Sequence, residues 1–261
     1  MIRSCLTASA LLAAIAFAGT LAAAPAQQGQ PPQQQLPPPK AYKAVPIQLP
    51  KPLADPSHEA FRKQLAGIAQ KKDRAALGRL IANNFFWIPE DKDVADKRKP
   101  GIDNLAKALG LDGRQAPGWD VLASIVTDAT AEPYADRQGV VCGPAGPMFD
   151  EKAADELATE TGTEGGDWGY PAKDGVAVRS ALAPNSPVTE KLGLHLIRVY
   201  PDDSPAAAAQ GDAMRIVTPS GKVGYVNGED VLPLDTDQIC YVKEGNAWKI
   251  AGAIGGVAPT P

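Results

Sequence analysis

The chain has 261 residues, with 26 basic and 30 acidic side chains and a formal net charge of −4. This acidic balance argues against binding to nucleic acid or to an anionic membrane surface, because both need basic patches. With 3 cysteines and 2 histidines, the chain has little material for metal or nucleophilic chemistry.

The first 26 residues have the pattern of a secretory signal peptide. Arg3 precedes an apolar run over residues 6–21, and Ala24 and Ala26 occupy the positions that signal peptidase reads. The mature chain is therefore predicted to begin at Gln27, to be periplasmic or secreted, and to have no membrane span. An uncleaved membrane anchor is the alternative, although the run is slightly short of the roughly 20 residues that a span needs.

Residues 27–56 are rich in glutamine and proline. Proline removes backbone donors and glutamine supplies no core, so this stretch is predicted to be a semi-extended linker rather than a folded unit. Pro37-Pro38-Pro39-Lys40 leaves a second interpretation open, that of a proline-rich ligand for a domain of another protein.

Residues 57–167 are predicted to form a mainly helical domain. Ser57 and Asp73 can cap two successive helices, the first running to about residue 72 and the second to about residue 84. An aromatic run is too short for a helix and predicts a strand over residues 85–88. Apolar spacing and capping residues predict further helices over residues 102–109, 119–126 and 150–158.

A charged loop follows the aromatic run and contains Asp91, Asp93 and Asp96. A calcium loop needs a glycine at its sharp bend and a distal glutamate at fixed spacing, and both are missing here. Basic residues in the same loop neutralise the carboxylates. A solvated loop is therefore favoured over a metal site.

Between residues 175 and 234, short apolar runs alternate with turn residues. This rhythm predicts a small antiparallel barrel, and Pro219-Ser220-Gly221-Lys222 supplies a hairpin turn within it. Strands are expected near residues 176–178, 188, 194–200, 214–217, 223–226 and 231–234.

Two segments of this region, GVAVRSALAPNSPVTEKLG and GKVGYVNGEDV, resemble bacterial SH3-like domains. The first is similar to the opening strand and loop of the family, and the second to its later turn and strand. Two features depart from the family pattern: Met214 stands where a tryptophan is frequent, and an insertion at residues 205–209 lengthens the preceding loop. The resemblance implies an SH3-like barrel and a binding function.

Residues 238–242 and 247–254 are predicted to form one more hairpin, which either extends the barrel sheet or packs that sheet against the helical part. The expected fold class is α+β. A mainly helical domain is followed by an SH3-like β-barrel domain with an extra hairpin, over residues 168–256.

Cys142 and Cys240 are the two cysteines that remain after signal cleavage, since Cys5 precedes the apolar run and leaves with it. An even count in an exported chain predicts a disulfide between them. Both lie in apolar runs that are expected to be buried, so two inert core thiols are the alternative.

Catalytic residues are scarce in the mature chain. His58 is expected at the exposed start of a helix, and His195 within a barrel strand. Cys142 lacks the surrounding pattern of a Cys-His peptidase, and no phosphate loop or G-x-S-x-G elbow occurs. We therefore expect no enzyme activity, no cofactor and no metal.

The predicted function is that of a non-catalytic periplasmic binding or scaffold protein. Its partner would be peptidoglycan or an envelope protein, with Tyr200, Tyr225 and Trp248 as candidate contact residues on the barrel. Each of these aromatic residues could equally belong to a core. A cell-envelope hydrolase or a regulator of one is the alternative, because SH3-like domains often accompany such enzymes.

Overall fold

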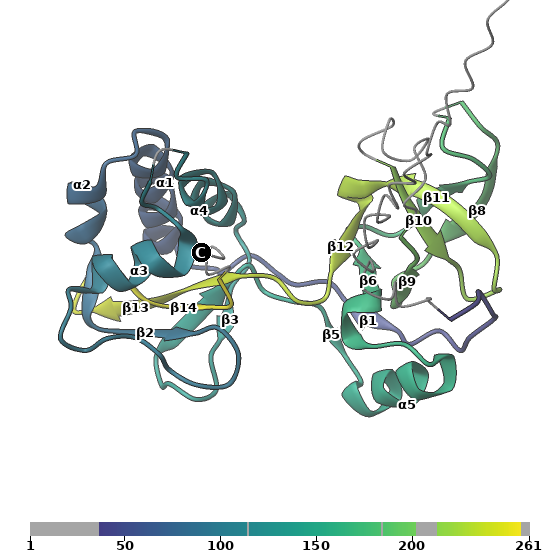
Figure 1. Ribbon diagram of the computed structural model, residues 1–261, viewed down its shortest axis with the longest axis horizontal. Helices are drawn as coiled ribbons and strands as arrows, with labels where there is room; N and C mark the ends of the chain where they lie inside the picture. Colours follow the sequence, from purple (N-terminus) through teal and green to yellow (C-terminus); the bar gives the residue numbers. More distant parts are fainter. Residues whose placement is uncertain (1–36, 114, 184, 202–212, 257–261) are drawn as a thin grey trace, which may run out of the picture. The chain divides into compact units, whose positions relative to one another are not determined.

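The structure is a computed structural model that describes residues 37–113, 115–183, 185–201 and 213–256. Within these residues the chain is mixed α+β, and most strands lie in the C-terminal half (Figure 1). The predicted signal peptide, residues 27–36 of the predicted linker and the insertion at residues 205–209 lie outside the described residues.

One sheet has five strands in the order β2-β14-β13-β4-β3. β14 pairs with β2 in parallel, and the other neighbours pair antiparallel. In that order the strands are β2 (Ile81–Ile88), β14 (Ala247–Ile254), β13 (Gln238–Glu244), β4 (Val140–Gly143) and β3 (Glu132–Pro133).

Helices cover one face of this sheet (Figure 1). Side chains alternate across a strand, so Phe85 and Trp87 of β2 face the helices, whereas Phe86 belongs to a cluster on the opposite face. Leu65, Leu105 and Leu122 bring the helices onto the sheet as fully buried side chains. The helices are α1 (Pro56–Gln70), α2 (Arg74–Gly78), α3 (Gly101–Leu109) and α4 (Gly118–Thr127).

The C-terminal hairpin of β13 and β14 pairs with β4 and β2, not with the barrel strands. Of the two alternatives left by the sequence, extension of the barrel sheet is wrong, because the hairpin belongs to the five-stranded sheet. The predicted division at residue 168 therefore has to be corrected, because the hairpin supplies two central strands to the sheet beneath the helices.

Two local predictions at the helices also need correction. Asp55, not Ser57, caps α1, since its Oδ1 accepts hydrogen bonds from the amides of Ser57 (2.7 Å) and His58 (3.3 Å). Asp73 does cap α2, but this helix ends at Gly78 rather than near residue 84. Ile81 already belongs to β2, whose pairing with β14 overrides the local helical pattern.

The other sheet has seven strands, all antiparallel, in the order β12-β6-β9-β10-β11-β7-β8. Six of them lie where the sequence predicts strands, and β6 was not predicted. In order they are β12 (Val231–Pro233), β6 (Trp168–Pro171), β9 (Ile197–Val199), β10 (Ala213–Val217), β11 (Val223–Asn227), β7 (Val176–Arg179) and β8 (Val188–Leu192).

One face of the seven-stranded sheet forms a hydrophobic core of its own. Gly224 lies in this face, where a Cβ would approach Val178 Cγ1 to 2.2 Å, so only glycine fits between the strands. The core residues are Val176, Val178, Leu192, Ile197, Ile216, Val226 and Val231.

The second half of the predicted linker is part of this fold, and its prediction as a spacer has to be corrected. Residues 37–49, which we call the strap, bury Tyr42, Val45 and Ile47 against the opposite face of the seven-stranded sheet. The strap includes β1 (Ile47–Gln48), which pairs with β5 (Met148–Phe149) just before α5 (Glu151–Thr161). Three apolar side chains at irregular spacing give no periodic signal, which explains why the sequence pattern missed them.

The predicted disulfide between Cys142 and Cys240 is confirmed. The two cysteines are register partners on β4 and β13, and both are buried. The bond therefore links the C-terminal hairpin to a strand 98 residues earlier in the chain. None of the helices in the described part of the chain has both the length and the apolar content to cross a membrane.

Candidate binding face

The structure places the three predicted contact residues in two different sheets. Tyr200 and Tyr225 lie on the seven-stranded sheet, and both are half-buried. Trp248 lies on β14 of the five-stranded sheet and is only 9% exposed. The three aromatic residues therefore do not form one barrel site.

Trp248 has the surroundings of a core residue. Its Nε1 donates a 2.9 Å hydrogen bond to Ser57 Oγ, and its ring centroid lies 4.9 Å from that of His58. Lys243 Nζ lies 5.5 Å from the ring centroid. These contacts attach β14 to the start of α1, and they leave little of the indole for a ligand.

Tyr200 and Tyr225 belong to a row of alternating arginine and tyrosine that crosses the seven-stranded sheet. Arg179 on β7 is the register partner of Tyr225 on β11, and Tyr225 is the register partner of Arg215 on β10. The amide of Tyr200 donates to the carbonyl of Arg215, which adds Tyr200 at the end of the row. Directly opposed residues of antiparallel strands share one face, so these four side chains lie side by side, and all are half-buried.

We call this row of four residues the binding face, and Arg198 on β9 lies beside it as a buried residue. The guanidinium carbon of Arg215 lies 4.5 Å from the ring centroid of Tyr200, and that of Arg198 lies 5.2 Å from it. The Tyr200 ring is therefore in cation–π contact with two arginines. Arg215 also donates from Nε to the Tyr200 carbonyl at 2.9 Å, which fixes its orientation.

The three arginines were not singled out from the sequence, although a signal for them exists. Each one interrupts an apolar strand at an alternate position, in VAVR, LIRVY and AMRIV. Alternation places the arginine on the face opposite the apolar core of the sheet. Only the strand order of the folded sheet brings the three together.

The binding face carries two arginines, and a third lies beside it, within a chain of net charge −4. In the described part of the chain, neither Arg179 nor Arg198 forms an ion pair. Arg179 is held by a 2.9 Å hydrogen bond from Nη1 to the Ser186 carbonyl, which leaves its charge uncompensated. The remaining donors of Arg179, the register partner of Tyr225, suit a carboxylate-bearing ligand.

The two histidines lie apart from this face. His58 is buried, with 1% of its surface exposed, which corrects the prediction of an exposed helix start. Its Nε2 has no hydrogen-bond partner among the described residues, and burial lowers the pKa of the imidazole to about 4. His195 is half-buried, with Nδ1 3.1 Å from the Leu196 carbonyl oxygen.

Ser57 and Lys243 make the closest approach to a catalytic pair. Lys243 Nζ lies 3.1 Å from Ser57 Oγ, but it also forms a 3.1 Å ion pair with Asp55. Hydrogen bonds from Ser57 and Lys243 hold the pKa of Asp55 well below its usual range, so the carboxylate is charged. Ser57 Oγ donates to Asp55 Oδ1 at 2.6 Å and accepts from Lys243 and Trp248, so the hydroxyl belongs to the capping network of α1.

The aspartate-rich loop is organised by its own backbone. Asp93 Oδ1 accepts from the amides of Trp87 and Ala95, and Oδ2 accepts from Lys97 and Arg137. Burial opposes ionisation of Asp93, but these hydrogen bonds outweigh it and lower the pKa. In the described part of the chain, no group of three or more histidine, cysteine or acidic residues is arranged to hold a metal ion.

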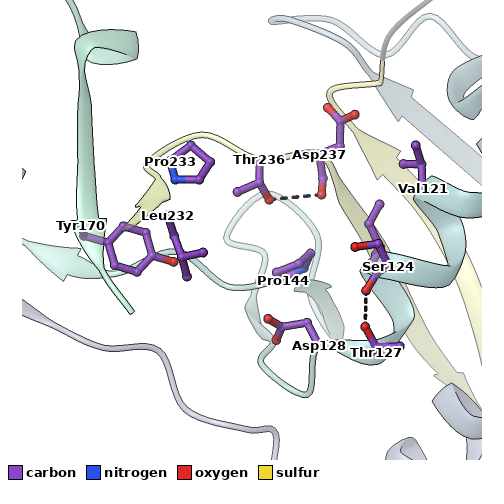
Figure 2. A pocket seen from close by; sticks show the side chains of 11 residues that line it. Val121, Ser124, Thr127, Asp128, Pro144, Tyr170, Leu232, Pro233, Thr236 and Asp237 are labelled. Atoms are coloured by element: carbon purple, nitrogen blue, oxygen red, sulfur yellow. Dashed lines mark hydrogen bonds between the residues drawn. The ribbon is translucent and has the colours of Figure 1, made fainter. Parts of the chain in front are cut away.

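A pocket of about 640 Å³ has a mainly apolar lining that includes Tyr170 and Leu232 (Figure 2). Both carboxylates in this lining already accept hydrogen bonds from other residues. Asp128 Oδ1 accepts from the amide and hydroxyl of Thr130, and Asp237 Oδ1 accepts from the amide of Gly256. The residues that line this pocket include no histidine, cysteine, lysine or arginine, so it offers no acid–base pair of unlike groups.

Comparisons of the chain with protein-family models, with curated proteins and with solved structures give no match.

Proposed function

We propose that this protein is a non-catalytic periplasmic binding or scaffold protein, and that its seven-stranded sheet is an SH3-like domain. The ligand would be a carboxylate-bearing component of the cell envelope, either peptidoglycan or an acidic segment of an envelope protein. The observation that carries this proposal is the row in which Arg179, Tyr225, Arg215 and Tyr200 alternate across one half-exposed face.

The pairing of the two family-like segments supports the SH3-like interpretation. One segment contains β7 and the other contains β11, and these strands pair through Arg179 and Tyr225. The residues that carry the resemblance are therefore neighbours in the sheet, and they also form the centre of the binding face.

The disulfide supports export, because such bonds persist mainly in oxidising compartments. Export through the predicted signal peptide would yield a mature protein that begins at Gln27. N-terminal sequencing of protein recovered from the envelope tests this, and an intact mass that includes residues 6–21 would contradict it.

Co-sedimentation with purified peptidoglycan tests the binding function. Tyr225→Ala and Arg179→Ala should each reduce the retained fraction by about tenfold, since each removes a contact that is worth roughly 1–2 kcal/mol. Arg98→Ala is the charge-matched control, because Arg98 is highly exposed on a loop after β2 and should not affect retention. Equal retention of all three variants would contradict the proposed face.

A zymogram run in parallel separates this proposal from its alternative. Retention without clearing of the peptidoglycan supports a binding module, whereas clearing by the purified protein supports an envelope hydrolase. If the retained fraction falls steeply with added salt, the arginines act through charge.

A further inference from the structure

The strap lies along the seven-stranded sheet as an added segment. The amide of Leu196 donates to the Val45 carbonyl at 2.9 Å, and the amide of Ile47 donates to the Leu194 carbonyl at 3.1 Å. Pro46 and His195 form an isolated antiparallel bridge between these two bonds, so the strap pairs with the segment that precedes β9. Main-chain bonds of this kind also hold extended peptides that bind by strand addition. They hold the backbone of any extended segment, with little dependence on its side chains.

Side chains of the strap fill the surface beneath it. Tyr42 Oη donates a 2.9 Å hydrogen bond to the Val217 carbonyl, and its ring contacts that of Trp168 edge to face at 5.1 Å between centroids. Val45 and Ile47 are buried in the same cluster. An occupant of this site therefore needs one aromatic residue followed by apolar residues at the third and fifth positions after it.

Arg198 anchors the beginning of the strap. Its guanidinium is 1% exposed and donates to the carbonyls of Pro37 and Pro38, the latter at 3.2 Å. Its Nε has no hydrogen-bond partner, and no carboxylate pairs with it, within the described residues. A buried guanidinium without an acid is unfavourable unless hydrogen bonds satisfy it, so this site is built for a segment that presents backbone carbonyls.

Consecutive prolines meet that need. A proline nitrogen carries no hydrogen, so Pro37 and Pro38 cannot donate to a sheet ladder, while their carbonyls still accept. Their fixed φ angles also reduce the entropy that is lost when the segment is ordered.

The charged residues beside the strap give a second preference for the segment that occupies this position. Lys43 lies with Asp150, Glu156 and Glu160 around a groove of about 280 Å³ between the strap and α5. Lys40 donates from Nζ to the carbonyl oxygen of Glu160. The surface beside the strap therefore favours basic residues after the prolines.

We propose that Arg198 and the segment of residues 194–196, which precedes β9, are a peptide-binding site that the strap fills within its own chain. In trans, the site takes an extended, basic, proline-containing segment of another protein. Its pattern is two or more prolines, a lysine, and an aromatic residue followed by apolar residues. This site is next to the arginine–tyrosine row and does not depend on the ligand of that row.

The attached strap masks the site in the intact protein. A tethered segment acts at an effective concentration on the order of millimolar, so a free peptide at micromolar concentration competes poorly with it. Binding in trans should therefore become measurable only when contacts of the strap are weakened while the site itself is kept.

Complementation by a labelled peptide tests the proposal. The probe is the synthetic peptide of residues 36–49, LPPPKAYKAVPIQL, titrated by fluorescence anisotropy onto the full mature chain. Tyr42→Ala removes the strap's aromatic anchor but leaves the site intact. We expect this variant to bind the peptide at least tenfold more tightly than the unmodified protein, because the peptide supplies the missing tyrosine.

Matched controls identify the contacts. A peptide in which the residue corresponding to Tyr42 is alanine should bind at least tenfold more weakly. Addition of Arg198→Lys to the Tyr42→Ala protein should lower affinity similarly, since lysine keeps the charge but loses the guanidinium fork. If Tyr42→Ala does not fold, as judged by its amide spectrum, Val45→Ala replaces it. Absence of binding to a folded variant, or equal affinity with Arg198→Lys, would overturn the proposal. The proposed function is tested separately, by the retention of Tyr225→Ala and Arg179→Ala on peptidoglycan.

Discussion

The indole of Trp248 and the hydroxyl of Ser57 are joined by a 2.9 Å hydrogen bond, although 191 residues separate them in the chain. This bond attaches β14, the last strand in chain order, to the first turn of α1. It explains why an aromatic residue that the sequence offers as a ligand contact is part of a core.

We predict that Trp248→Ala destabilises the protein without removing a ligand contact. Deletion of a buried tryptophan should lower the free energy of unfolding by about 3–5 kcal/mol. Denaturant titration measures this loss, and Trp248→Phe should recover most of it. Retention on peptidoglycan, measured where the variant is folded, should match that of the unmodified protein, and a selective loss of retention would place Trp248 in the site.

The buried imidazole of His58 predicts a stability that depends on pH. Its pKa falls from an ordinary value of 6.5 to about 4 in the folded chain, so the unfolded chain binds more protons between these values. The contribution of the neutral imidazole to the free energy of unfolding is fully present above pH 6.5 and is lost as the pH falls through 4. It amounts to about 3 kcal/mol at most, because one pKa unit corresponds to about 1.4 kcal/mol.

The variant His58→Phe tests this dependence, since it keeps an aromatic ring near Tyr241 and Trp248 and cannot be protonated. Urea unfolding at pH 7, 6, 5 and 4 should show a smaller acid-induced loss for the variant. If the free energy of unfolding falls in parallel with pH for the two proteins, carboxylates alone cause the loss of stability in acid.

The disulfide predicts a large effect of reduction on stability. It closes a loop with a sequence separation of 98, for which the chain-entropy model gives about 4.7 kcal/mol. The double variant Cys142→Ala, Cys240→Ala should therefore have a lower melting temperature, and a reductant should lower that of the unmodified protein but not that of the variant. Alkylation of both thiols in unfolded, unreduced protein would show that the bond is absent.

We predict that the side chain of Arg62 stabilises the C-terminal end of α4. Its Nη1 donates to the carbonyls of Val126, Thr127 and Asp128 at 2.9, 3.1 and 2.7 Å. The last turn of α4 has no basic residue of its own, so a guanidinium from α1 satisfies these groups. Arg62→Ala should cost about 1–3 kcal/mol in the free energy of unfolding. Faster amide exchange confined to α4 would locate the effect there.

In this protein, a sequence pattern predicts a helix or strand well when the residues of that helix or strand alone determine its structure. The spacing of Leu105 and Leu109 predicts α3, and Asp150 correctly marks the start of α5. The alternation in VAVR predicts β7, and the tight turn at residues 219–222 predicts β11 as its return strand. In each case the backbone hydrogen bonds or capping contacts are local, or the apolar period is long enough to read.

The sequence by itself predicted most strands of the seven-stranded sheet and the cysteine pair Cys142 and Cys240, and the structure decided between a disulfide and two free thiols. Only the tertiary structure decided that β13 and β14 join β2 and β4, that the strap is folded, and that Arg198 meets the carbonyls of two prolines. The reason is physical. Strand partners and covered faces are set by contacts between distant residues, and a local pattern of apolar and polar side chains does not say which partner will bury it.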